Sequence, residues 1–244
     1  MIRIFLGNLG SGKTLSAVRE LALDNSGRKT YTNISVRGIK NAVHIKPEYV
    51  IKKEEDEKGK LKLDLNTEYW NQQKKPLNLL WDEVHLTANS RRSMSSINQV
   101  FSKFIAMGRR IVGFDKRGYG CLTFIAQAER TIDRNIKELA NEIRYHVSYW
   151  YIECNSCKSK IIVSSEMEQF SKCTKCGSWE IERKGLQIEV KRYKSWANYL
   201  NSQIDTKKHK WHFDRFMLYD AEDYYKYYET LQMEDIWGDY IKED

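Results

Sequence analysis

GNLGSGKT occupies residues 7–14 and matches the phosphate-binding pattern G-x-x-x-x-G-K-[ST]. The apolar run IRIFL precedes it at 2–6, and the helical-looking TLSAVRELALD follows at 14–24. A strand, a glycine-rich loop and a helix in this order place bound phosphates at a helix N-terminus, where backbone N–H groups face them. The stretch therefore predicts a phosphate-binding loop in an α/β fold.

The residue types in this loop suit a triphosphate. Glycines let the backbone curl so that successive N–H groups point at phosphate oxygens. The lysine would reach the β- and γ-phosphates, and the threonine hydroxyl would bind Mg²⁺. We therefore expect ATP and Mg²⁺ as ligands, with contacts from the whole loop: Gly7, Asn8, Leu9, Gly10, Ser11, Gly12, Lys13 and Thr14.

A second apolar run, LNLLWDEVH at 77–85, contains two adjacent acids. Buried parallel strands read as continuous apolar runs, and ligands bind beyond their carboxyl ends. Asp82 would therefore complete the Mg²⁺ site beside Thr14. Glu83 could accept a proton from the water that attacks the γ-phosphate, which favours hydrolysis over transfer to a small acceptor.

A third strand is expected in CLTFIAQ at 121–127, which ends in Gln127. A neutral amide at this edge of the sheet can contact both the γ-phosphate and the attacking water. The alternative is that Gln127 simply begins a loop and has no catalytic task.

These motifs, in this order, resemble the FtsK/HerA branch of P-loop ATPases, and within it the Zot-like ATPases of filamentous phages and archaeal viruses. The resemblance rests on GNLGSGKT, LLWDEVH and IAQAERTIDRNIKELAN, and it extends to SRRSMSSINQVFSKFIAMGRR and FMLYDAEDYYKYYET. It covers most of residues 1–145 and a patch around 213–230.

The resemblance implies a RecA-like fold with a central, mostly parallel sheet, in a ring of identical subunits that moves or packages double-stranded DNA or drives virion assembly. Capsid or virion proteins are then expected partners. Lys13, Thr14, Asp82, Glu83 and Gln127 take the nucleotide-handling roles of the family. Phage members carry a membrane segment after the ATPase core, whereas no apolar stretch here approaches the ~20 residues of a membrane span. This departure favours a cytoplasmic packaging motor.

The net positive charge of the chain agrees with double-stranded DNA as a partner. Among 244 residues the formal net charge is +8, and the pI is about 9.1. A basic balance favours a polyanion such as nucleic acid. A merely lysine-rich solvated surface is the alternative.

Ring ATPases complete each site with an arginine from the neighbouring subunit, whose charge stabilises the transition state. Arg109 is the favoured residue, because it ends the helical-looking INQVFSKFIAMG, where the resembled family places a basic residue. The other candidates are Arg91, Arg92, Arg110, Arg130 and Arg134.

Four of the five cysteines form two C-x₂-C pairs: Cys154 with Cys157, and Cys173 with Cys176. Fifteen residues separate the pairs, which is the spacing of a closed, structural zinc site. Flanking stretches rich in aromatic and β-branched residues predict two strands. We therefore expect a zinc ribbon at the tip of an antiparallel β-arm, inserted at 146–185 between the core segments 1–145 and 186–244. Whether this tip contacts DNA or a neighbouring subunit is left open.

Two other function classes compete with the motor. Nucleotide kinases that resemble adenylate kinase carry a four-cysteine zinc lid of similar spacing, but they lack an apolar strand ending in Asp-Glu. They also clamp phosphates with arginines, whereas lysines dominate here. A zinc-ribbon DNA-binding protein with an inactive NTPase fold is the third possibility, and the intact Lys13, Thr14, Asp82 and Glu83 argue against it.

Overall fold

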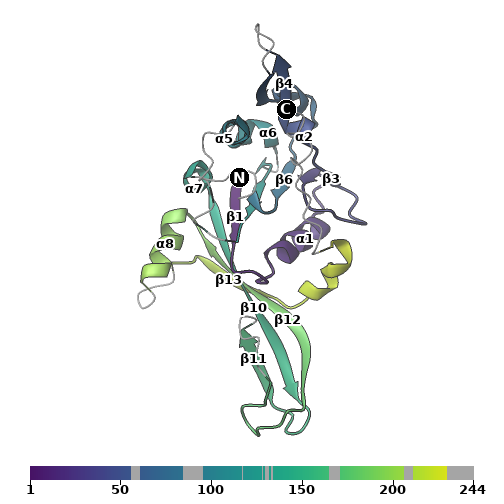
Figure 1. Ribbon diagram of the computed structural model, residues 1–244, viewed down its shortest axis with the longest axis vertical. Coiled ribbons are helices and arrows are strands. Elements are labelled where there is room, and N and C mark those ends of the chain that lie inside the picture. The colour runs from purple at the N-terminus through teal and green to yellow at the C-terminus, as the bar shows by residue number, and fades with distance from the viewer. Residues whose placement is uncertain are drawn as a thin grey trace.

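One mixed sheet joins strands from both ends of the chain (Figure 1). The computed structural model describes residues 1–55, 61–84, 96–116, 118–127, 129, 132, 134–164, 171–205 and 211–229. Among these, nine strands form the sheet, with the order β13-β12-β10-β1-β9-β6-β2-β3 and with β11 paired to β10. Five of the pairings are parallel and three are antiparallel, which confirms the expected mixed α/β fold with a mostly parallel centre.

The parallel part of the sheet is short and buried. Its centre is β1 (Ile2–Leu6), flanked by β9 (Leu122–Ile125) and then β6 (Asn78–Trp81), while β2 (Thr30–Thr32) and β3 (Ala42–His44) complete one edge. All four residues of β9 are buried, as expected for a strand covered on both faces.

Successive side chains along each strand point to opposite faces of the sheet, so each strand contributes to two apolar layers. On one face, Phe5, Leu80 and Ile125 pack against the residues of α1 (Lys13–Leu23), and the 3₁₀ helix η3 (Ala221–Tyr227) lies beside α1. On the opposite face, side chains such as Ile4, Trp81 and Phe124 belong to the larger core. That core includes residues of α5 (Ser96–Ala106), α6 (Gly108–Val112), α7 (Arg134–Leu139) and α8 (Trp196–Ile204).

Smaller elements lie outside this sheet. A hairpin of β4 (Ile51–Glu55) and β5 (Leu61–Leu65) is preceded by α2 (Pro47–Val50) and followed by α3 (Thr67–Gln72). A second, two-residue pairing joins β7 (Phe114–Asp115) to β8 (Gly118–Tyr119). Within the described ranges, no helix is both long and apolar enough to cross a membrane.

A long arm leaves the sheet on the side of β10 (Figure 1). β10 (Glu142–Cys154) and β12 (Ile181–Tyr193) have 13 residues each and pair antiparallel from Ile143–Tyr193 to Cys154–Ile181. The first residues of β10 also pair with β1, and its outer half pairs with β11 (Lys160–Ser164). β13 (Asp214–Leu218) pairs with β12. The strands of the arm are therefore continuous with the core sheet.

Candidate nucleotide-binding site

The phosphate loop lies between β1 and α1, at the carboxyl ends of the parallel strands. Two of its glycines are required by close contacts and by positive φ angles. Gly7 has φ 147°, and a Cβ there would lie 2.5 Å from the carbonyl oxygen of His146. Gly12 has φ 83°, and a Cβ there would lie 2.3 Å from Cδ1 of Ile188. Side chains rarely adopt such φ values, and neither position has room for a methyl group.

Lys13 is buried and turned back onto the loop. Its Nζ donates to the carbonyl oxygens of Gly7 at 2.9 Å and Asn8 at 2.8 Å. Burial lowers the pKa of Lys13, and the nearby carboxylates of Glu83 and Asp82 act against that shift. Phosphate oxygens are charged acceptors and form stronger hydrogen bonds with an ammonium group than carbonyls do. The lysine therefore lies where the loop could present it to a triphosphate.

Thr14 and Asp82 meet, although they are 68 positions apart in the sequence. The Thr14 hydroxyl donates to Oδ2 of Asp82 at 2.7 Å. Burial raises the pKa of Asp82, and the bond from Thr14 opposes this rise. A hydroxyl and a carboxylate are the hard oxygen ligands that Mg²⁺ accepts alongside water and phosphate oxygens. These two residues could hold the metal ion of a bound nucleotide.

Glu83 has an unusual backbone conformation and a specific neighbour. Its φ is 49°, in the left-handed region that non-glycine residues seldom adopt, and its N–H donates to Oδ1 of Asp82 at 2.8 Å. The Gln127 amide donates to Oε1 of Glu83 at 2.9 Å. The structure therefore brings together Lys13, Thr14, Asp82, Glu83 and Gln127 around one edge of the sheet.

Asn33 belongs to this constellation but is not identified by the sequence analysis. It follows β2, and its side-chain amide forms two hydrogen bonds with the backbone of Asp82. Its Nδ2 donates to the Asp82 carbonyl oxygen at 2.9 Å, and the Asp82 N–H donates to its Oδ1 at 2.7 Å. The available signal was a polar residue directly after the short run TYT at 30–32, and a polar residue after a strand also marks Asp82 and Gln127.

The base of the arm forms the floor of the loop, and no local sequence pattern predicts this contact. The Ser148 hydroxyl donates to the carbonyl oxygen of Gly10 at 2.9 Å. His146 is 1% exposed, and its Nδ1 lies 3.2 Å from the carbonyl oxygen of Leu6. Burial lowers the pKa of His146 to about 3, so the ring is neutral at physiological pH. The loop therefore rests directly on β10.

Arg109, Arg110 and Arg134 are all exposed. Arg109 lies on α6, and its charge acts on the amino group of Met1, at the end of the sheet opposite the phosphate loop. Arg134 begins α7 and forms an ion pair of 2.5 Å with Glu138. Three further candidates lie outside the described residues: Arg91, Arg92 and Arg130.

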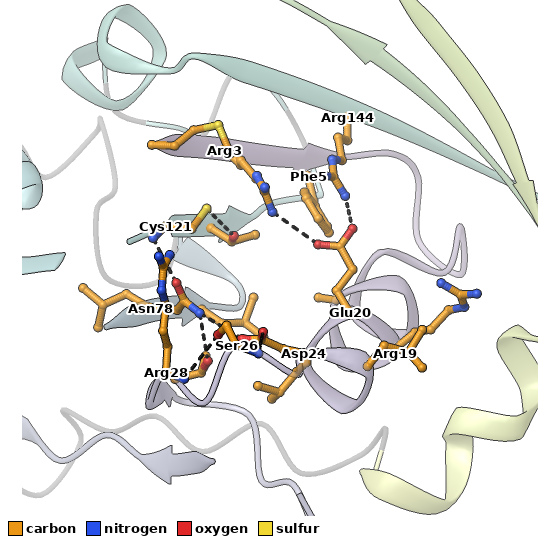
Figure 2. Close-up of a pocket in the computed structure, with 18 of the residues that line it drawn as sticks. Arg3, Phe5, Arg19, Glu20, Asp24, Ser26, Arg28, Asn78, Cys121 and Arg144 are labelled. Carbon is orange, nitrogen blue, oxygen red and sulfur yellow. Dashed lines mark hydrogen bonds and ion pairs between the residues drawn. The ribbon is translucent and has the colours of Figure 1, made fainter. Parts of the chain in front are cut away.

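A hollow of about 590 Å³ lies at that opposite end, between the first residues of several strands and the end of α1 (Figure 2). Arg3 donates to Glu20 at 3.4 Å across it, and Arg144 forms an ion pair with the other Glu20 oxygen. Arg144 also binds Glu142 at 2.6 Å. These ion pairs link α1 to β1 and β10, and the hollow is separate from the nucleotide loop.

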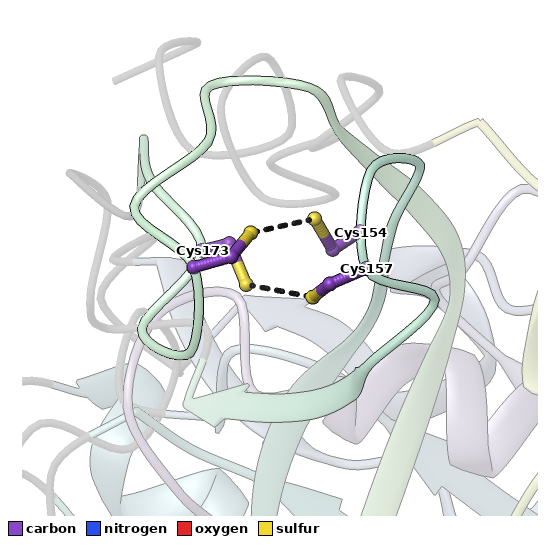
Figure 3. Close-up of side chains that lie close together, drawn as sticks. Cys154, Cys157 and Cys173 are labelled. Atoms are coloured by element: carbon purple, nitrogen blue, oxygen red, sulfur yellow. Dashed lines mark hydrogen bonds between the residues drawn. The ribbon is translucent and has the colours of Figure 1, made fainter.

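The four paired cysteines converge at the tip of the arm (Figure 3). Their Sγ atoms all lie within 4.8 Å of one another, with 3.6 Å between Cys154 and Cys176 and 3.6 Å between Cys157 and Cys173. Zn–S bonds of about 2.3 Å in a tetrahedron would separate the sulfurs by about 3.8 Å. The cluster could therefore hold a tetrahedral metal ion.

The two cysteine turns have matching backbones. In each, the N–H of the residue after the second cysteine donates to the carbonyl of the first: Lys158 to Cys154 at 2.9 Å, and Gly177 to Cys173 at 2.8 Å. Lys158 and Gly177 both have positive φ, at 56° and 73°. A non-glycine residue such as Lys158 seldom adopts that conformation. The two matching turns indicate that this backbone conformation directs both pairs of sulfurs toward one point.

Comparison with known proteins gives one family and a few solved structures. The family model described as zonular occludens toxin (Zot) matches residues 1–174. No curated protein sequence matches the chain. Among solved structures, the N-terminal domain of zonular occludens toxin from Neisseria meningitidis is 15% identical with a TM-score of 0.47, over 93% of this chain and 98% of that one.

A second solved structure is the genome packaging NTPase B204 from Sulfolobus turreted icosahedral virus 2. In complex with ATP-gammaS it is 10% identical with a TM-score of 0.36, over 59% of this chain and 74% of that one. In complex with AMP it is 11% identical with a TM-score of 0.35, over 59% and 73%.

Proposed function

Because the chain belongs to the zonular occludens toxin (Zot) family, we propose that it is an ATP-hydrolysing motor that moves double-stranded DNA, in virus genome packaging or virion assembly. The observation that carries the proposal is the meeting of Thr14 with Asp82 at 2.7 Å and of Gln127 with Glu83 at 2.9 Å, directly beside the phosphate loop. These contacts join the start of α1 and the residue that follows β9 to the acidic pair that follows β6. A motor acting on viral DNA would work in the host cytoplasm.

In this proposal the loop binds the triphosphate through backbone N–H groups from Gly7 to Thr14, and Lys13 leaves its two carbonyl partners for phosphate oxygens. Thr14 and Asp82 would hold Mg²⁺. When bound, Mg²⁺ neutralises charge on the β- and γ-phosphate oxygens. The chain itself orients the nucleotide, because the loop is packed on β10 and β12 through Ser148 and Ile188.

Glu83 acts as the base in this scheme. A water oxygen bonds to the γ-phosphorus, the bond from that phosphorus to the bridging oxygen of ADP breaks, and a proton of the water passes to the Glu83 carboxylate. Gln127 holds Oε1 of Glu83 and thereby fixes the direction in which the carboxylate faces. The arrangement supports hydrolysis better than transfer to a second nucleotide.

Assembly into a ring completes the site in this proposal. Arg109 is exposed on α6 and lies at the end of the sheet away from its own phosphate loop. An arginine in that place can reach a triphosphate only in a neighbouring subunit. We assign it the trans role, with Arg110 and Arg134 as the alternatives.

The cysteine cluster takes a structural zinc ion in this proposal. Four thiolates at near-tetrahedral separations leave no position for a substrate or water, so the ion would stabilise the arm and not the reaction. Residues 1–145 and 186–244 then form the ATPase core, and residues 146–185 form the zinc-ribbon insertion. The arm is a candidate contact for DNA or for the next subunit.

Phosphate release from ATP separates this proposal from its two alternatives. The measurement is made alone, with double-stranded DNA, and with AMP, and Lys13→Ala serves as the inactive control. Release that rises with DNA and disappears in Lys13→Ala supports the motor. Formation of ADP from AMP would instead identify a nucleotide kinase. DNA binding without any phosphate release would identify a binding module with an inactive NTPase fold.

A further inference from the structure

We propose that Asn33 is a positioning residue that fixes the peptide of Asp82, and through it both the Mg²⁺-binding carboxylate and the base Glu83. This inference rests on the proposed function, because it concerns the same site. It adds a residue that directly follows β2, a strand that carries no recognised nucleotide motif.

The first argument is the geometry of the amide. β2 and β6 pair in parallel from Thr30–Asn78 to Thr32–Leu80, and beyond this register the backbone of β2 no longer pairs with β6. The Asn33 side chain continues the ladder one step further, since it both donates to and accepts from the backbone of Asp82, at 2.9 and 2.7 Å. Among neutral side chains only a carboxamide offers a donor and an acceptor side by side.

The second argument is the conformation that follows Asp82. Glu83 has φ 49°, and a non-glycine residue keeps such a conformation only where its surroundings hold it. The preceding peptide is held by Asn33, and the Glu83 N–H is held by Oδ1 of Asp82 at 2.8 Å. If the Asn33 bonds are removed, the backbone can relax, and both carboxylates would move relative to Thr14 and Gln127.

The third argument is that Asn33 is itself anchored. The next residue, Ile34, is buried, and its N–H donates to the Thr32 hydroxyl at 3.1 Å. Further along, the Arg37 N–H donates to the carbonyl of Tyr227 at 2.7 Å, and Val36 bridges Tyr228. The segment is tied at both ends, so the amide is held in place before any ligand binds.

The test separates Mg²⁺ binding from nucleotide binding, and it does not require turnover. Affinity for ATPγS is measured with EDTA and across a Mg²⁺ titration for wild type, Asn33→Ala and Asn33→Asp. Asn201→Ala, on the exposed face of α8, is the matched control. Asn33→Asp keeps the size of the side chain and the acceptor for the Asp82 N–H, but it loses the donor and adds a charge. Thermal unfolding of each variant is followed in parallel.

We expect the affinity without Mg²⁺ to stay within about threefold of wild type in both Asn33 variants, because the loop contacts are intact. The Mg²⁺ concentration for half-maximal binding should rise about 10- to 100-fold, the usual cost of losing a partner behind a metal ligand. Turnover should fall through kcat more than through KM. Asn201→Ala should match wild type in every measurement.

Two results would overturn the inference: a wild-type Mg²⁺ titration in both variants, or an equal loss of affinity with and without Mg²⁺, which would mean general damage to the site. If Asn33→Ala does not fold, Asn33→Asp decides between these outcomes. Binding is measured with ATPγS and does not depend on turnover. A protein that binds Mg²⁺ and nucleotide but never releases phosphate would therefore contradict the proposed motor, while the role of Asn33 in Mg²⁺ binding could still be decided.

Discussion

Gln127 and Glu83 meet at the carboxyl ends of the adjacent strands β9 and β6, where the Gln127 amide donates to the Glu83 carboxylate at 2.9 Å. The two residues are 44 positions apart in the sequence. Their contact fixes the orientation of the carboxylate that we assign as the base.

This contact predicts that Gln127→Ala lowers kcat for ATP hydrolysis by about 10²-fold, comparable to the loss of one well-aimed donor in an active site. ATP affinity should change little, because Gln127 does not belong to the phosphate loop. The measurement is steady-state phosphate release together with equilibrium nucleotide binding. Gln203→Ala, at an exposed position of α8, is the control, and its kcat should equal that of wild type. An unchanged kcat in Gln127→Ala would remove this residue from the mechanism.

Gly12→Ala should abolish nucleotide binding. The new Cβ would lie 2.3 Å from Cδ1 of Ile188, and the backbone has φ 83°. Gly27→Ala is a matched control, since Gly27 has φ 72° but open space around its Cα. Both variants carry the backbone strain of about 1–2 kcal/mol, and only Gly12→Ala carries the clash. Equal ATP affinities in the two variants would show that packing of the loop on the arm is unimportant.

The cysteine cluster should hold one zinc ion per chain. Metal analysis of the purified protein should find one equivalent, and Cys173→Ser should lose it, because three thiolates no longer close the tetrahedron. Cys121→Ser is the control, as Cys121 is half-buried near Thr123 and does not lie in the arm. Cys173→Ser should also unfold at a lower temperature. Metal-free wild-type protein with an unchanged unfolding temperature would contradict this assignment.

Stability should fall as the pH drops below about 6.5, through the buried His146. In the folded protein its pKa is lowered to about 3 from an ordinary 6.5, by burial first and also by the charges of Arg144 and Lys13. Between these values the unfolded chain binds a proton that the folded chain does not, so the free energy of unfolding decreases by about 1.4 kcal/mol per pH unit.

Glu142 adds a second loss of folding stability, at lower pH. Its pKa is lowered to about 2 from 4.5, since bonds from Arg192 and Arg144 outweigh its burial. The stability that it contributes is present above 4.5 and is lost as the pH falls towards 2. Denaturant unfolding measured from pH 7 to 5 therefore isolates the contribution of His146. In His146→Gln the free energy of unfolding should depend less on pH in that range. A slope that persists in His146→Gln would assign the loss to another group.

The sequence was sufficient for the loop, for the arm, and for the two strands that precede Asp82 and Gln127, although β9 covers only Leu122–Ile125 of the expected 121–127. Each of these has a local signature: a glycine pattern, a continuous apolar run, or a pair of cysteine turns between β-branched stretches. The meeting of Thr14 with Asp82 also follows from the rule that ligands gather at the carboxyl ends of parallel strands.

Other parts of the site depend on strand order, which no local pattern encodes. β2 has only three residues, so Asn33 can be placed beside Asp82 only once β2 is known to pair with β6. Likewise β10 pairs with β1 across about 140 residues, and this pairing turns the polar His146 into a buried floor for the loop. The trans role that we propose for Arg109 would involve a second subunit, and contacts between subunits have no signature in the sequence of one chain.

The most direct test compares wild type with Glu83→Gln in a single-turnover assay of phosphate release from Mg²⁺-ATP. Glu54→Gln, on the exposed hairpin strand β4, serves as the control. We predict that Glu83→Gln binds ATP as wild type does but releases phosphate about 10²- to 10⁴-fold more slowly, as expected for loss of a general base. Release at the wild-type rate in Glu83→Gln would contradict the account.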